Sequence, residues 1–406
     1  VVGELTSERN LRLFYKSVPV ADIDMNFLFT QPTTAKGAVI ETLPRAPVAF
    51  SEPSDAQAYG AVLKKILASP NVCSKESVVR RYDHEVKGST AIKPFQGASN
   101  DGPGDAAVIR PLRNSWKGAA LSNGFNPLFS SDAYKMAASA IDEAIRNNVC
   151  VGGRRWALLD NFSWGNPNDE RQAGGLVAAS RACYDFALAF RAPFISGKDS
   201  LHNECNSVAI PQTLLVSALG ILPDVRRAVT MDAKRAGNFL YIAGETKLEL
   251  GGSHYCAVNN ALEAGALPGV DGAKAFALYE AVLRAMDAGI VRSCHDCSEG
   301  GLAVAAAEMG FAGGLGVEID LTQVPRAADV KRNDLALFSE SNSRLLVEVE
   351  PERAKEFEAS LKGIVFGRIG VFTQNPDLVV KVFDGTEILR ENVFELKRVW
   401  QKPLKR

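Results

Sequence analysis

Residues 294–301 read Cys-His-Asp-Cys-Ser-Glu-Gly-Gly and separate the apolar pair Ile290-Val291 from a helix predicted over 299–309. The segment places Ser298 at the start of that helix, where free backbone N–H groups and the helix dipole favour an anion. Asp296 would then hold the counter-cation, because hard divalent ions prefer carboxylate oxygens. The alternative is an ordinary helix cap without a ligand.

The same segment contains a Cys-x-x-Cys pair, Cys294 and Cys297, which is also typical of zinc or redox sites. No second pair of this kind exists, and His295 lies inside the pair, where it cannot easily complete a tetrahedron. The chain has seven scattered cysteines and only four histidines. We therefore expect no disulfide framework and no zinc site, and we expect a reducing, cytoplasmic location.

Strands and helices alternate on both sides of this segment, and several connections resemble hairpins. This pattern predicts an α+β or mixed α/β fold. The helices are expected over 55–68, from Asp132 to just before Gly152, over 175–190 and over 272–288. The strands are expected over 107–109, 118–122, 239–243, 316–321, 344–349 and 364–372.

The chain of 406 residues is long enough for two or three domains. Pro223 and the basic pair Arg226-Arg227 indicate a boundary. We predict a tail and linker over 1–50, a first domain over 51–222 and a second domain over 223–406. Val1 is not methionine, so the chain is expected to be processed, cut or expressed as a piece.

The two ends of the chain resemble each other. Two short strands are predicted over 11–23, and a hairpin over 378–389 turns at Asp384-Gly385, a strong hairpin signal. The similarity indicates a duplicated unit, and two unrelated hairpins are the alternative.

The composition excludes some function classes. Hydrophobic residues make up 46% and the formal net charge is −1, so a folded core is expected and a nucleic-acid or anionic-membrane binder is not. No apolar run approaches the roughly 20 residues of a membrane span, and the N-terminus does not read as a signal peptide. No G-x-[SC]-x-G nucleophile elbow occurs, so the chain shows no glutaminase or esterase of its own.

Three further segments carry residues suited to phosphate or metal. Asp101-Gly102-Pro103-Gly104-Asp105 combines glycines with carboxylates, although a tight turn is the alternative. Glu143 and Asn147 are spaced i, i+4 on one helix face and would suit a hard cation, unless that face is merely solvated. Ser196-Gly197-Lys198-Asp199-Ser200 follows an apolar strand and forms a plausible phosphate pocket without P-loop spacing.

Taken together, these segments resemble phosphoribosylformylglycinamidine synthase, an ATP-dependent amidoligase of purine synthesis. The matching strings run in family order over about 75–320 and are 78–88, 101–110, 159–167, 193–204 and 295–302. The resemblance implies a tandem duplication of an N-type and a C-type domain, both similar to aminoimidazole ribonucleotide synthetase. This chain resembles the second copy, preceded by the tail of the first.

The resemblance implies a reaction and its partners. ATP phosphorylates the amide oxygen of formylglycinamide ribonucleotide, and glutamine-derived ammonia displaces phosphate to give formylglycinamidine ribonucleotide, ADP and phosphate. The implied partners are the upstream half of the enzyme and a glutaminase domain or subunit. The principal catalytic histidine is expected upstream, in a Ser-Glu-His-Cys-like string that this chain lacks; we interpret His84 as its degenerate counterpart.

The resemblance also implies the site residues, in a structural site for ATP or ADP with Mg²⁺ and in one wall of the catalytic site. The residues assigned to nucleotide are Lys75, Asp160, Gly197, Lys198 and Ser298. The residues assigned to magnesium are Asp105, Glu143, Asn147 and Asp296. Ser200 is assigned to the substrate. Lys198 stands where short forms of the family carry an asparagine metal ligand, and a lysine suits phosphate better than magnesium.

Two other hypotheses remain open. The chain is a nucleotide-stabilised structural half without catalysis, or it is a different ATP enzyme of the same superfamily, such as a selenophosphate synthetase or a thiamine-phosphate kinase. If the partner half is missing, an exposed apolar sheet face is expected to drive self-association of the fragment.

Overall fold

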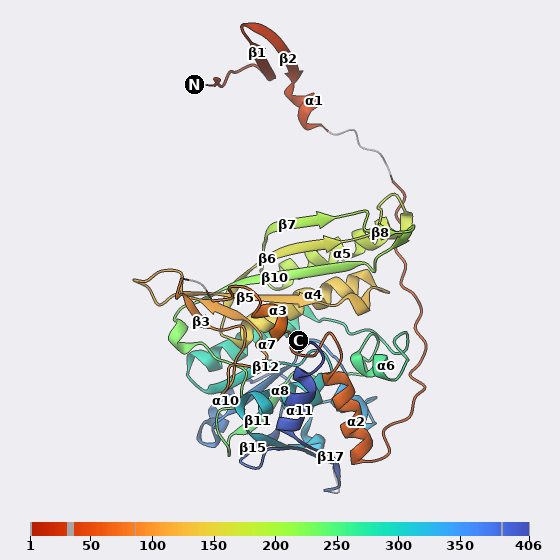
Figure 1. The fold of residues 1–406 in the computed structure, drawn as a ribbon, viewed down its shortest axis with the longest axis vertical. Coiled ribbons are helices and arrows are strands. Elements are labelled where there is room, and N and C mark those ends of the chain that lie inside the picture. Colours follow the sequence, from red (N-terminus) through yellow and green to blue (C-terminus); the bar gives the residue numbers. More distant parts are fainter. Residues whose placement is uncertain (1, 31–35, 86, 383–384, 406) are drawn as a thin grey trace.

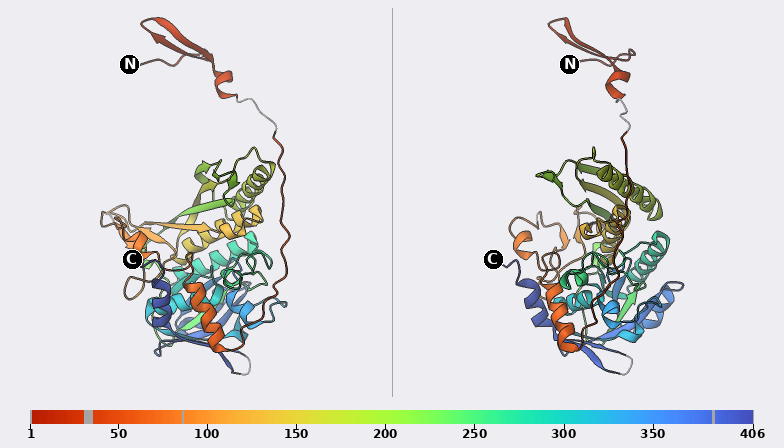
Figure 2. Two further views of the ribbon diagram at one scale, coloured as in Figure 1. Left: turned by 45° about the vertical axis from the view of Figure 1, so that its right-hand side comes forward. Right: turned by 90° about the vertical axis from the view of Figure 1, so that its right-hand side faces the viewer.

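The computed structural model describes residues 2–30, 36–85, 87–382 and 385–405. Val86, residues 31–35 of the predicted tail and Asp384 of the predicted turn lie outside this part. Figure 1 shows a body with two sheets and an N-terminal hairpin that stands apart from it, and both views in Figure 2 keep that separation. The hairpin consists of β1 (Asn10–Tyr15), β2 (Val18–Asp24) and the short helix α1 (Met25–Phe29).

The upper sheet of the body has six strands in the order β3-β4-β5-β10-β6-β7. Only β6 and β7 run parallel, and the other neighbours are antiparallel. The bounds are β3 (Thr90–Ile92), β4 (Ala107–Ile109), β5 (Gly118–Phe125), β10 (Thr213–Leu222), β6 (Arg154–Ser163) and β7 (Phe194–Ser200). Every second residue of β10 is buried, so one face of this sheet packs inward.

Helices α4 (Ala133–Cys150) and α5 (Glu170–Ala189) cover the inward face. The predicted start of α4 is confirmed, because the Asp132 side chain accepts from the Lys135 N–H at 3.0 Å. The predicted start of the second helix is wrong by five residues, because Asp169 caps α5 through the N–H groups of Arg171 and Gln172. Gly174 lies inside this helix, where a side chain would collide with the Val39 carbonyl.

The lower sheet has seven strands in the order β12-β14-β11-β15-β13-β16-β17, with only β13 and β16 parallel. The bounds are β12 (Val291–Asp296), β14 (Leu345–Val349), β11 (Phe239–Ala243), β15 (Phe366–Thr373), β13 (Gly316–Asp320), β16 (Asp377–Lys381) and β17 (Glu387–Asn392). All of β14 is buried, because helices cover both faces. Mixed sheets in both units confirm the α+β class.

The helices around the lower sheet divide between its two faces. Those on one face are α7 (Gly272–Asp287) and α10 (Ala354–Ser360), and those on the other are α2 (Ala56–Leu67), α8 (Gly301–Gly313) and α11 (Val393–Gln401). A helix was predicted over 299–309, but α8 begins two residues later, at Gly301, because Gly300 adopts a left-handed φ of 75°. The remaining short elements are α3 (Glu76–Val79), β8 (Glu204–Cys205), β9 (Val208–Ala209), α6 (His254–Val258) and α9 (Asn333–Phe338).

One apolar core joins the two units. It contains Met136 and Phe186 from the helices of the first sheet together with Leu278 and Leu345 from the second unit. Helix α2, assigned by its place in the sequence to the first domain, instead packs into the separate core over the second sheet, for example through Leu63. The predicted domain bounds remain a prediction, but the packing shows that the two units share one hydrophobic interior.

Burial determines how reactive the cysteine thiols are. All seven cysteines are free, and Cys294 and Cys297 are both buried in the described structure. Burial raises the pKa of Cys297 and raises that of Cys183 to about 12, so neither thiol is poised as a nucleophile. Along the described chain, no helix has the length and apolar character that a membrane crossing requires.

The outward face of the first sheet carries exposed apolar side chains. Leu121 is 46% and Phe125 44% exposed, and their neighbours Leu219 and Leu215 on β10 are only partly buried. We expect the chain to self-associate through this face at tens of micromolar, as measured by light scattering. Leu121→Lys should shift it towards monomer, while Val365→Lys, at an exposed position elsewhere, should not. A clean monomer for the unaltered chain would contradict this expectation.

Candidate functional site

The site forms where β12 runs into α8. The apolar pair Ile290-Val291 is followed by polar residues, yet the strand continues to Asp296 because Cys294, His295 and Asp296 pair with β14. The pairing fixes His295 and Asp296 at the end of a buried strand. Ser298 follows two residues later, and its carbonyl accepts from the Gly301 N–H at 3.0 Å.

Asp105, His295 and Asp296 form a buried cluster. The His295 Nδ1 lies 2.8 Å from the Asp105 Oδ1, which also accepts from the Asp296 N–H at 3.1 Å. Ligand atoms of the three residues all lie within 4.8 Å of one another, close enough to share a metal ion. The structure thus brings together two of the predicted magnesium ligands.

His295 and Glu308 were not predicted as site residues. The His295 Nε2 lies 3.0 Å from the Glu308 Oε2, so the ring bridges two carboxylates. These carboxylates raise the pKa of His295 well above its ordinary value although burial acts in the opposite direction. Glu308 is the one charged residue of helix α8. A single carboxylate in an otherwise apolar helix is the sequence feature from which Glu308 could be predicted as a site residue.

Arg146 is a further buried residue of the site, and it was not among the predicted residues. It reaches from α4 to Asp296 at 3.3 Å and to the Ser298 hydroxyl at 2.6 Å, and it also pairs with Asp142 on its own helix. The Asp142 carboxylate accepts in turn from the Tyr279 hydroxyl at 2.6 Å. Burial raises the pKa of Asp296, but Arg146 and His295 together hold it below its ordinary value.

Glu143 and Asn147 share one face of α4, as predicted. Glu143 accepts from the Asn126 amide at 2.7 Å, and the Asn147 amide donates to the Asn123 carbonyl at 3.1 Å. Burial, followed by the nearby charges of Glu299 and Asp296, raises the pKa of Glu143 well above its ordinary value. Glu143 therefore belongs to the same acidic group as Asp296.

The donor set fits a hard cation. The Asp105 Oδ2 and the Asn147 Oδ1 are both buried and have no hydrogen-bond partner among the described residues. A buried oxygen without a partner costs about 1–3 kcal/mol, and Mg²⁺ takes carboxylate and amide oxygens. Two of the four predicted ligands thus offer oxygens that the protein itself leaves unsatisfied.

Lys75 lies beside this acidic group. Its Nζ donates to the carbonyls of Asn71 at 3.1 Å and Cys73 at 2.5 Å. Burial lowers the pKa of Lys75 below its ordinary value, although the nearby groups Cys73, Glu299 and Glu308 act to raise it. The lysine therefore lies in the neighbourhood of Glu299, which directly precedes Gly300 at the start of α8.

The other predicted residues lie at the edge of the first sheet. Asp160 is opposite Gly197 on β7, and the Asp160 carboxylate occupies the space that a side chain at position 197 would need. Lys198 and Ser200 point to the opposite, open face, because neighbouring residues in a strand alternate. The Ser200 hydroxyl donates to the Asn203 side chain at 3.2 Å. The structure thus separates this group from the buried cluster and divides it between two faces.

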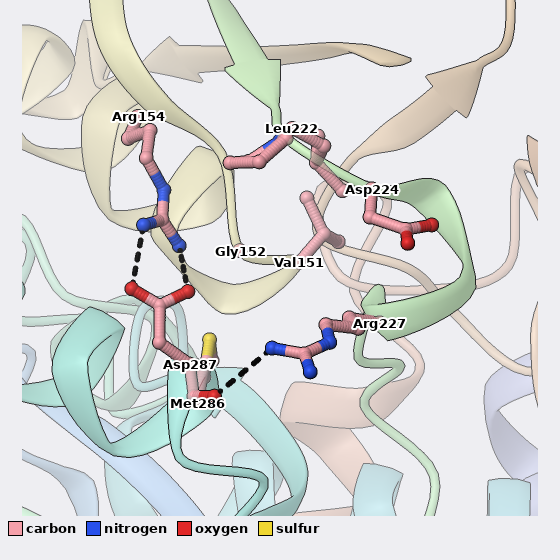
Figure 3. A pocket seen from close by; sticks show the side chains of 9 residues that line it. Val151, Gly152, Arg154, Leu222, Asp224, Arg227, Met286 and Asp287 are labelled. Atoms are coloured by element: carbon pink, nitrogen blue, oxygen red, sulfur yellow. Dashed lines mark hydrogen bonds and ion pairs between the residues drawn. The ribbon is translucent and has the colours of Figure 1, made fainter. Parts of the chain in front are cut away.

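A cavity of about 220 Å³ lies elsewhere, between the end of β10 and the C-terminal end of α7 (Figure 3). Arg154 closes one side through two hydrogen bonds to Asp287, at 2.7 and 2.8 Å, and Arg227 donates to the Asp287 carbonyl at 3.2 Å. No predicted site residue lines this cavity. Through these hydrogen bonds, Arg154 and Arg227 of the first unit and its border are joined to Asp287 on α7 of the second unit.

The fold and the site define a class of protein. The model of the AIR synthase related protein, N-terminal domain, matches residues 103–222, and that of the C-terminal domain matches residues 235–383. The chain therefore belongs to the AIR synthase related family.

Within this class, the whole chain is similar to phosphoribosylformylglycinamidine synthase subunit PurL. It is 31% identical to the subunit of Thermoplasma acidophilum over 408 residues and 34% identical to that of Moorella thermoacetica over 420 residues. The matches cover 100% of this chain but 52% and 54% of the relatives, so the chain spans about half their length. The resemblance inferred from the motifs is confirmed.

Solved structures share the fold. Thermotoga maritima PurL complexed with FGAR has a TM-score of 0.66 at 18% identity, over 86% of this chain and 54% of that one. HypE from a HypE–HypF complex has a TM-score of 0.60 at 17% identity, over 78% of this chain and 98% of that one. At these identities the likeness establishes the fold alone.

Proposed function

We propose that this chain is the second half of an ATP-dependent amidoligase that converts formylglycinamide ribonucleotide and glutamine-derived ammonia to formylglycinamidine ribonucleotide. The observation that carries the proposal is the convergence of Lys75, Asp105, Asp296 and Ser298 at the start of α8. These residues come from distant parts of a chain whose relatives are PurL subunits. The name of one solved PurL structure includes FGAR, and another includes ATP.

The buried cluster is the proposed structural site for ADP or ATP. Asp105, Glu143, Asn147 and Asp296 would hold Mg²⁺, which neutralises phosphate charge when bound. Lys75 and Ser298 would bind the phosphates at the helix start. Asp160, Gly197, Lys198 and Ser200 would contribute to the catalytic site from the edge of the first sheet, Lys198 and Ser200 from its open face and Asp160 and Gly197 from the opposite face. The upstream half would complete this site.

The N-terminal hairpin is the proposed tail of a preceding C-type domain. In both hairpins two antiparallel strands run directly into a helix, which Asp24 caps in one case and Asn392 in the other. In the C-terminal copy Val380 is fully buried within the sheet, whereas Leu13 in the N-terminal copy is 50% exposed. A second sheet of the same kind would bury the exposed side chains.

The location and partners follow the same reasoning. Seven free cysteines favour the cytoplasm. A glutaminase domain or subunit would supply ammonia, since the chain has no nucleophile elbow for that reaction. A purely structural, nucleotide-stabilised role remains the second candidate, because the open sheet edge supplies only one wall of a site.

Thermal unfolding tests the nucleotide site. At about 100 times its dissociation constant, magnesium with ADP should add about 2.7 kcal/mol to the free energy of unfolding. Asp105→Asn should abolish this gain, because it halves the charge that Asp105 and Asp296 offer the cation. Asp320→Asn, on an exposed cap of the second unit, should retain it. An unchanged melting temperature for the unaltered chain would remove the basis of the proposal.

A further inference from the structure

His254 carries a buried ring nitrogen without a partner. The residue is 5% exposed, and its Nε2 makes no hydrogen bond within the described part of the chain. The other ring nitrogen, Nδ1, donates to the Glu340 Oε1 at 3.1 Å. Leaving a buried polar atom without a hydrogen bond costs about 1–3 kcal/mol. A ligand that bonds Nε2 would therefore remove this cost.

Glu340 connects His254 to the start of α8. The same Glu340 oxygen accepts from the His254 backbone N–H at 2.8 Å and from the Gly300 N–H at 2.7 Å. Gly300 directly precedes the 13-residue helix and, as a glycine, offers no side-chain oxygen to the first N–H groups of that helix. Free N–H groups and the helix dipole favour an anion at this position.

The charges around His254 favour a donor at Nε2. Burial alone lowers the pKa of His254, but the Glu340 carboxylate, with Glu299 further away, raises it above its ordinary value, while Lys75 opposes them. A protonated imidazole carries hydrogen at both nitrogens. Lys75 and Glu299 both influence the pKa of His254, so the ring lies in their neighbourhood.

We propose that the His254 Nε2 donates a hydrogen bond to a phosphate oxygen of the nucleotide bound beside Lys75 and Ser298 at the start of α8. The inference rests on the proposed function and adds a residue to its nucleotide site. His254 comes from a different segment, at the start of α6, and so closes the site from a third part of the chain.

Calorimetric titration with ADP and magnesium tests this role. His254→Gln should weaken ADP binding by about 10–100-fold, the loss expected for one charge-assisted hydrogen bond. His84→Gln is the matched control, because the His84 ring contacts its own neighbours in sequence, the Tyr82 carbonyl at 3.2 Å and the Glu85 carboxylate at 3.8 Å, and should leave ADP binding unchanged. Equal affinity for ADP in folded His254→Gln would overturn the role of His254 while leaving the nucleotide site intact.

A measurement on the unaltered chain covers the case in which His254→Gln does not fold. With ¹⁵N-labelled histidine only four residues give signals, and inorganic pyrophosphate should shift that of the His254 Nε2. A shift with pyrophosphate but no ADP binding would support the anion site and refute the nucleotide proposal. ADP binding that leaves the His254 signal unmoved would refute the role of His254. No response to either ligand would refute both.

Discussion

Replacing Arg146 by methionine lowers the free energy of unfolding by about 3–5 kcal/mol. The guanidinium is buried and pairs with Asp142 and Asp296, which also come from opposite sides of the junction between the two units. Methionine fills much of the volume but leaves Asp142 without its cation and Asp296 with His295 alone. Removing one partner of a buried ion pair is costly because the remaining charge stays out of water.

The matched control is Arg181→Met. Arg181 is also on a helix and also pairs with an aspartate one turn away, but its side chain is 77% exposed. Its loss should change the free energy of unfolding by less than about 0.5 kcal/mol. Chemical denaturation of the three proteins compares them directly. Similar stabilities for both variants would show that Arg146 does not hold the junction together.

Without an upstream half, the chain should show no amidoligase turnover with ATP, formylglycinamide ribonucleotide and ammonia. The predicted catalytic wall lies on the open edge of the first sheet, where Lys198 is exposed and Ser200 only partly covered. Catalysis requires reacting groups held together in one geometry, and a single wall cannot supply that. Adding the upstream half as a separate protein should restore phosphate release that depends on the ribonucleotide.

Ser200→Ala tests the substrate role within the restored enzyme. It should lower kcat/KM about tenfold, equivalent to about 1.4 kcal/mol, without changing the melting temperature. Ser360→Ala, at a partly buried serine at the end of α10, should leave turnover unchanged. Substantial turnover by the 406-residue chain alone would show that the catalytic residues lie within it, with His84 the first to examine.

Much of the fold was predictable because its signals are local. The Asp132 cap and the apolar periodicity located α4, and the apolar run over 239–243 located β11. The start of α5 was missed because Gly174 and Gly175 resemble helix breakers, although in the structure they allow other segments to approach closely. The continuation of β12 was missed because His295 and Asp296 are polar, yet pairing with β14 buries them.

The two aspartates of the buried cluster were among the predicted residues, whereas Arg146, His295 and Glu308 were not. Asp105 and Asp296 could be named because carboxylates beside glycines suit a metal in any context. Arg146 and His295 could not, because their roles depend on partners about 150 and 190 residues away in the sequence. Their burial follows from packing α4 against the second unit, and no local pattern in the sequence encodes it.

Titration of the chain with Mn²⁺ in place of Mg²⁺, followed by electron paramagnetic resonance, tests the central claim most directly. The buried oxygens of Asp105 and Asn147 predict that ADP and Mn²⁺ bind together, each strengthening the other. Asn147→Leu should weaken Mn²⁺ binding at least tenfold, while Asn259→Leu, whose amide bonds only within α6, should not. Mn²⁺ binding that is indifferent to both ADP and Asn147→Leu would contradict a metal–nucleotide site at the start of α8.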